Sequence, residues 1–176
     1  MSAPVALPQI SYTAPGFDAA FMASLHEYGF AAVVDHPLDG DRVARIYGEW
    51  LAFFSSGKAS GFRMDPVKQD GYFSLEEAEH AKGFVERDFK EYFQFYPWGR
   101  CPESLQSDLA SHFDAAVELG AELLNCIARS LPEAVTAELT EPLRDMIHGS
   151  EQSMLRVLHY PPVPTGRSVL RAAPHE

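Results

Sequence analysis

Three side chains near the carboxyl end of this 176-residue chain could take part in chemistry: Arg156, Tyr160 and His175. Arg156 is a permanent cation, Tyr160 carries a phenolic hydroxyl, and the imidazole of His175 can bind a metal or exchange a proton. Because side chains alternate along a strand, Arg156, Leu158 and Tyr160 would share one face of a strand here. A single imidazole does not hold a metal ion usefully, so these residues alone describe only part of a site.

Each of these residues also has a plainer interpretation. Tyr160 could be a buried core tyrosine whose hydroxyl is satisfied elsewhere. Arg156 could sit at a rim and pair with a surface carboxylate. His175 is the penultimate residue of the sequence, and a lone histidine so near a terminus is usually exposed and without function.

The chain ahead of these residues is predominantly helical in its pattern. Apolar residues at intervals of three and four predict helices over 17–28, 41–55, 103–130 and 132–147. Glycines at 29 and 57 are well placed to end the first two helices.

The remaining segments predict less regular structure. Prolines in residues 1–15 indicate an extended leader, and the apolar run 30–34 predicts a short buried strand. Residues 57–100 are rich in glycine, aromatic and charged residues, which favours mostly loop.

A strand is also predicted over residues 154–160, and both of its faces carry apolar side chains. Such a strand is covered on both sides, and the helices can cover only one of them. Since burial of a large apolar side chain is worth about 1.5–3 kcal/mol, leaving the other face open is costly. We therefore expect the isolated chain to be poorly soluble or to be stabilised by a partner or an oligomer.

Composition excludes several classes of partner. A net charge of −11 disfavours nucleic acid and anionic membrane surfaces. No apolar run approaches the roughly 20 residues that span a bilayer, and the amino terminus lacks the pattern of a signal peptide. Cys101 and Cys126 are too far apart for a CxxC pair, so we expect two reduced thiols in a soluble cytoplasmic protein.

Six segments, in this order and at these intervals, resemble the isopenicillin N synthase-like iron(II)/2-oxoglutarate oxygenase family. The segments are Gly29-Phe30 with Val33–Pro37, Phe53-Phe54 with Lys58, Gly71–Phe73, Asp88–Phe93, Leu155–Pro162 and Ala173–Glu176. Each is weak alone, but together they cover nearly the whole chain.

This resemblance implies an α+β fold and a site. Residues 1–150 would form a mainly helical region, and residues 151–176 would form the first strands of a jelly-roll barrel that is truncated here. His175 would be the first iron ligand, with Tyr160 and Arg156 near the 2-oxoglutarate carboxylate or a substrate carboxylate. The cofactors implied are Fe(II) and 2-oxoglutarate, and the activity implied is oxidation of a C–H bond in a small-molecule substrate. Isopenicillin N synthase itself uses no 2-oxoglutarate, so the use of this co-substrate stays open, and we expect this chain alone to bind neither group.

The sequence also departs from the family pattern. The family places an Asp two residues after its first His, and a second His and an Arg-x-Ser pair later, and none of these is present. Non-haem iron sites of this kind need three protein ligands, of which this chain offers one. We therefore expect either an enzyme whose C-terminal half is missing, or a catalytically inactive helical fragment that acts through protein–protein interaction.

Other candidate residues favour structural roles. The charged run Arg87–Glu91 is interpreted as a solvated helical face rather than a substrate contact. Aromatic residues at 72, 73, 96 and 98 favour core packing over a substrate pocket. His159 has no ligand spacing with the other histidines.

Overall fold

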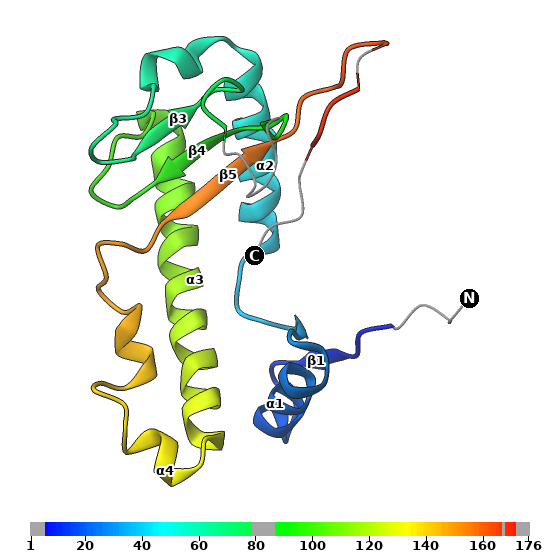
Figure 1. The fold of residues 1–176 in the computed structure, drawn as a ribbon, viewed down its shortest axis with the longest axis vertical. Coiled ribbons are helices and arrows are strands. Elements are labelled where there is room, and N and C mark those ends of the chain that lie inside the picture. Colours follow the sequence, from blue (N-terminus) through cyan, green and yellow to red (C-terminus); the bar gives the residue numbers. More distant parts are fainter. Residues whose placement is uncertain (1–5, 79–86, 167, 172–176) are drawn as a thin grey trace. The chain divides into compact units, whose positions relative to one another are not determined.

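The computed structural model describes residues 6–78, 87–166 and 168–171, and it divides into two compact units (Figure 1). The first unit comprises Met1–Asp39 and Asp114–Ser150, and the second comprises Gly40–Phe113 and Glu151–Glu176. The elements in chain order are β1 (Gln9–Ser11), α1 (Phe17–Tyr28), β2 (Ala32–Val34), α2 (Gly40–Ser55), η1 (Lys58–Phe62), β3 (Gly71–Phe73), β4 (Glu91–Phe95), α3 (Glu103–Ser130), α4 (Glu133–Thr136), η2 (Leu143–Met146) and β5 (Leu155–His159).

The start of the first unit confirms one predicted element and corrects another. Helix α1 is confirmed at Phe17–Tyr28, and it ends at Gly29 with a left-handed φ of 79°. The leader contains β1, which pairs in parallel with β2 so that Ile10 lies beside Val33. The predicted buried strand over 30–34 is wrong in its extent and burial, since β2 is only half-buried and Phe30 is 57% exposed. Its only strand neighbour among the described residues is β1, which leaves it less covered than a central strand.

The predicted helix over 132–147 is wrong. Only the short turns α4 and η2 form there, at Glu133–Thr136 and Leu143–Met146. Pro142 explains the break, because proline has no amide hydrogen and disfavours helical geometry at the residue before it.

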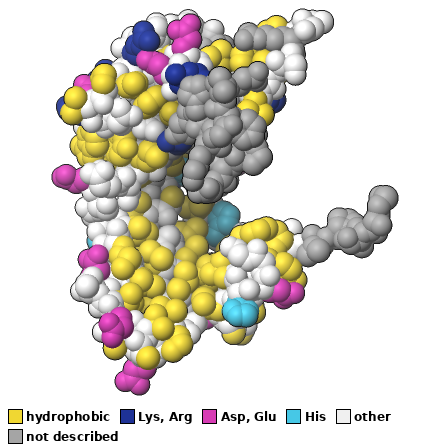
Figure 2. Space-filling view, viewed as in Figure 1, with side chains coloured by type: hydrophobic (Ala, Val, Ile, Leu, Met, Phe, Trp, Pro, Cys, Tyr) yellow, Lys and Arg dark blue, Asp and Glu magenta, His cyan; other side chains and the backbone are white. Residues whose placement is uncertain are grey.

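The core of the first unit is small. Its buried residues are Ile10, Phe17, Phe21 and Cys126, and hydrophobic neighbours such as Leu123 and Ile127 are only partly buried. Figure 2 shows many hydrophobic side chains at the surface along α3 and α1.

The second unit is built on a three-stranded antiparallel sheet in the order β3-β4-β5. The prediction of mostly loop over 57–100 holds for most of the described residues there, but it missed β3 and β4, which lie in that range. Tyr92, Phe93 and Phe95 of β4 are at most 1% exposed, so β4 is a central strand covered on both faces. A strand of this kind lacks the alternation that identifies a half-solvated strand in a sequence.

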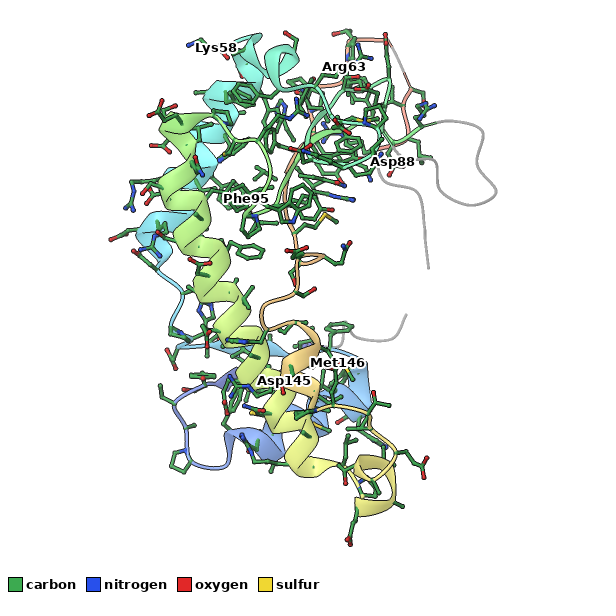
Figure 3. All side chains as sticks on the ribbon, turned by 90° about the vertical axis from the view of Figure 1, so that its left-hand side faces the viewer. Lys58, Arg63, Asp88, Phe95, Asp145 and Met146 are labelled. Atoms are coloured by element: carbon green, nitrogen blue, oxygen red, sulfur yellow. The ribbon has the colours of Figure 1, made fainter. Side chains whose placement is uncertain are left out.

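An aromatic core packs between α2 and the sheet (Figure 3). Trp50 is 1% exposed, and its ring centroid lies 4.8 Å from that of Phe93. Helix α2 confirms the prediction over 41–55. Phe53 on this helix is buried, whereas Tyr47 and Leu51 are 72% and 54% exposed.

Strand β5 confirms the strand predicted over 154–160, and it is left incompletely covered among the described residues, as the sequence predicted. Leu158 is 45% exposed. β5 pairs with β4 along one edge, and no strand of the described part of the chain pairs with its other edge. The few strands of the described residues form open sheets and not a barrel.

Candidate functional site

Arg156 is held against the sheet by its neighbours on β4. The antiparallel register places Arg156 beside Gln94 and Leu158 beside Tyr92. The guanidinium carbon lies 4.6 Å from the centre of the Tyr92 ring, a cation–π contact. With its amide oxygen facing Arg156, Gln94 accepts a hydrogen bond of 2.7 Å from Nη2. Arg156 is therefore already engaged within the sheet, and its predicted contact with a cofactor stays a prediction.

Tyr160 follows β5 directly and is 37% exposed. Its hydroxyl has no hydrogen-bond partner among the described residues. The carbonyls of Tyr160 and Pro161 accept bonds from Nη2 of Arg171, at 3.3 and 2.6 Å. The backbone N–H of Phe89 donates to the carbonyl of Leu170 at 2.7 Å. The segment that leads toward His175 thus returns to the start of β4.

His175 lies outside the described residues, so its role as a metal ligand stays a prediction. Within residues 6–78, 87–166 and 168–171, no group of three His, Cys, Asp or Glu side chains could hold a metal ion. The donors present there do not fit an iron centre by themselves, and we derive no chemical step through one.

The charged run 87–91 does not form the solvated helical face that its composition favoured. Nζ of Lys90 lies 3.0 Å from Oδ2 of Asp88, and both side chains are buried, at 7% and 3% exposure. Glu91 begins β4. Burial of charges is tolerated when each has a partner, and this pair provides one.

On the sheet face opposite Arg156 and Gln94, three polar side chains form a hydrogen-bonded chain across all three strands. Nδ1 of His159 on β5 lies 2.7 Å from Oε1 of Glu91 on β4. The hydroxyl of Tyr72 on β3 donates to the other oxygen, Oε2. Burial and the Glu91 carboxylate raise the pKa of Tyr72 well above its usual range, so this phenol is a neutral donor.

Local backbone contacts position Tyr72 for this chain. Its carbonyl accepts from the N–H of Met64 at 2.9 Å. Gly71 precedes it with a φ of 101°, and a Cβ at this position would lie 2.5 Å from the carbonyl oxygen of Phe62. The close approach of these two backbones therefore requires glycine.

Sequence reasoning missed this chain of side chains. His159 carries no metal-ligand spacing, and 68 residues separate it from Glu91. The one signal available was the alternation in 155–160, which places His159 on the face opposite Arg156 and Tyr160.

Of the four aromatic residues predicted to pack in the core, two are buried, Tyr72 is half-buried and Trp98 is exposed. Phe73 and Tyr96 are buried at 4% and 9% exposure, whereas Trp98 is 45% exposed. Trp98 donates from Nε1 to the carbonyl of Glu151 at 2.9 Å. Cys101 and Cys126 are free thiols, as predicted.

Comparison with solved structures supports the general class of oxygenases. A crystal structure of a candidate oxygenase from Shewanella oneidensis matches with a TM-score of 0.86 and 38% identity, over 96% of this chain and 61% of that one. The chain therefore spans about three fifths of that protein. Comparison with models of protein families found no match, and comparison with curated proteins found none.

Two further structures share the fold at lower identity. A candidate 2OG-Fe(II) oxygenase family protein from Caulobacter crescentus matches with a TM-score of 0.63 and 24% identity, over 91% of this chain and 58% of that one. A full-length protein of Neurospora crassa, solved in complex with alpha-KG, matches with a TM-score of 0.61 and 18% identity, over 95% and 59%. These two matches show that the chain shares its mixed helix and strand fold with somewhat more than half the length of each of these proteins.

Among the described residues, no helix has the length and apolar character needed to cross a membrane.

Proposed function

We propose that this protein is a non-haem iron(II)/2-oxoglutarate-dependent oxygenase that oxidises a C–H bond of a small molecule. The observation that carries the proposal is the match to the Shewanella oneidensis structure, at 38% identity over 96% of the chain. The other two matches, to a candidate 2OG-Fe(II) oxygenase and to a protein solved with alpha-KG, support the choice of cofactors.

Within this proposal, the protein resembles the isopenicillin N synthase-like branch. Residues 1–150 provide the mainly helical region, and residues 151–176 provide the first strands of a jelly-roll barrel. The resemblance assigns His175 to the metal, and further ligands are required from outside the described residues. Bound iron and 2-oxoglutarate would supply the oxidising chemistry.

Of the two residues proposed to contact 2-oxoglutarate, Tyr160 has the more available polar atom. Its hydroxyl has no partner among the described residues, and the residue is 37% exposed. Arg156 would have to exchange its contact with Gln94 to bind a carboxylate. We therefore assign the carboxylate contact to Tyr160 first and to Arg156 second.

The test is succinate formation from 2-oxoglutarate by the protein produced from its natural gene, with Fe(II) and O2 supplied. His175→Ala should reduce succinate to the level without enzyme. His148→Ala is the matched control, because this side chain is 52% exposed and pairs with Glu118. Tyr160→Phe should raise the KM for 2-oxoglutarate about 10- to 150-fold with little change in kcat, since a hydrogen bond to a charged group is worth about 1.5–3 kcal/mol.

Full activity in His175→Ala would refute the metal assignment. An absence of succinate in every preparation, together with an absence of stoichiometric Fe(II) binding, would instead favour an inactive fragment that acts through another protein.

A further inference from the structure

A groove lies between α2 and β5. It has a volume of 270 Å³. Figure 1 shows the two elements side by side. Its walls include the apolar or aromatic side chains of Tyr47, Leu51, Phe54, Val157 and Leu158.

Gly48 lines the groove and has no side chain to occupy it. It lies one position after Tyr47 on α2 and lines the groove, and a Cβ built on it would meet no atom within 4 Å. A Cβ at position 48, beside the groove, would therefore lie in open space.

His159 supplies a polar atom to these apolar walls. Its ring lines the groove and stacks on Phe54, with centroids 5.3 Å apart and an interplanar angle of 16°. Because the Glu91 carboxylate lies 2.7 Å from Nδ1, the neutral imidazole carries its hydrogen on Nδ1 and presents Nε2 as an acceptor. Nε2 has no hydrogen-bond partner among the described residues.

The Glu91 carboxylate, which is itself held by Tyr72, fixes the orientation of the His159 ring. Glu91 is only 13% exposed, and its second oxygen accepts from Tyr72. The carboxylate therefore cannot turn away from His159 without losing the Tyr72 hydrogen bond. This is the arrangement by which a carboxylate sets the tautomer of a histidine that acts on a ligand.

We propose that this groove binds a small, mainly apolar molecule with one hydroxyl group, which donates a hydrogen bond to Nε2 of His159. Ligand sites are typically apolar hollows of about 300–1,000 Å³ with a few placed polar groups, so the groove suits a ligand near the size of one aromatic ring. The proposal rests on the groove alone and is independent of the oxygenase assignment.

The test uses phenol and toluene, which have nearly the same shape and differ by the hydroxyl. Binding is followed by the NMR signals of the His159 ring and by the fluorescence of Trp50, which also lines the groove. Phenol should bind about two- to tenfold more tightly than toluene, the range expected from one neutral hydrogen bond, and should shift the His159 signals.

Three variants separate the contributions. His159→Phe keeps a ring over Phe54 and should bind phenol and toluene equally. Gly48→Leu should fill the groove and abolish binding of both, and it leaves the His159, Glu91 and Tyr72 contacts intact if His159→Phe fails to fold. Ala52→Leu adds a large side chain at an exposed position of α2 and should change neither affinity.

Equal affinities of the parent protein for phenol and toluene would overturn the proposal. So would unshifted His159 signals, or undiminished binding by Gly48→Leu. Sedimentation velocity adds one further outcome: a self-associated protein that binds neither probe would mean that a second copy covers the groove, which also overturns it.

Discussion

Nδ1 of His159 lies 2.7 Å from Oε1 of Glu91, and this contact joins β5 to β4 at the end of the sheet next to Tyr160. The same carboxylate accepts the hydroxyl of Tyr72 on β3. One side chain of the central strand therefore ties both outer strands to it.

Glu91→Gln should destabilise the protein by about 1.5–3 kcal/mol, the range for hydrogen bonds to a charged group. The amide keeps the size of the side chain but cannot accept two hydrogen bonds through two oxygens. Urea unfolding measures the change. Glu49→Gln, at an exposed position of α2, should change the free energy of unfolding by no more than about 0.5 kcal/mol. Equal effects of the two substitutions would contradict a structural role for Glu91.

Trp50→Ala should cost about 3–5 kcal/mol, because it opens a cavity among the aromatic side chains that join α2 to the sheet. Trp50 is 1% exposed and contacts Phe93. Trp98→Ala is the matched control, since Trp98 is 45% exposed and its indole makes one hydrogen bond, to Glu151. Loss of the Trp98 contact should cost about 0.5–1.5 kcal/mol by the same urea measurement. A larger loss of unfolding free energy in Trp98→Ala than in Trp50→Ala would contradict a core centred on Trp50.

Lys90→Met should cost about 3–5 kcal/mol, because it removes the cation that faces the buried carboxylate of Asp88. Adding Asp88→Asn to this variant should restore part of the stability, since the buried charge is then removed. Lys68→Met, at an exposed position, is the control for the loss of a lysine. If the double variant is as unstable as the single one, charge burial is not the cause.

The two thiols should react slowly in the folded protein at pH 8. Burial raises the pKa of Cys101 to about 12. Burial and the neighbouring Asp18 raise the pKa of Cys126 to about 11. The reactive species is the thiolate, so labelling with a chromogenic disulfide should accelerate only as the pH approaches these values. The urea-unfolded chain should react at pH 8 at the rate of a free cysteine, and an equal rate in the folded protein would exclude this environment.

The long helices were predictable because their signal is local. Helix α3 has apolar residues at helical intervals along its whole length, and its observed bounds are Glu103–Ser130. The predicted helix after it failed at Pro142, where a single residue overrides the apolar spacing.

The strands of the second unit were harder to predict because their order depends on distant partners. β4 has the sequence Glu-Tyr-Phe-Gln-Phe, and four of its five residues are buried. Its burial comes from β3, β5 and α2 together, which no local window contains. Asp88 and Lys90 lie just before β4 and were predicted to be solvated, because their burial also depends on residues distant in the sequence.

The residues of the candidate site were predictable only where they lie close together in the sequence. Arg156 and Tyr160 were found because they share one strand and its resemblance to a known segment. The contact between Glu91 and His159 was not found, since 68 residues separate them and neither stands out alone. The structure leaves the role of His175 as a prediction, because it lies outside the described residues.

The pairing of β4 with β5 across this separation has a consequence for synthesis on the ribosome. β4, η1 and the whole of α3 are translated before β5, so the nascent chain carries Phe93 and Phe95 without their edge partner. Closing so long a loop is entropically slow compared with forming a local helix. Until β5 is made, β4 therefore has an unpaired edge, a feature that makes partly folded chains prone to aggregation.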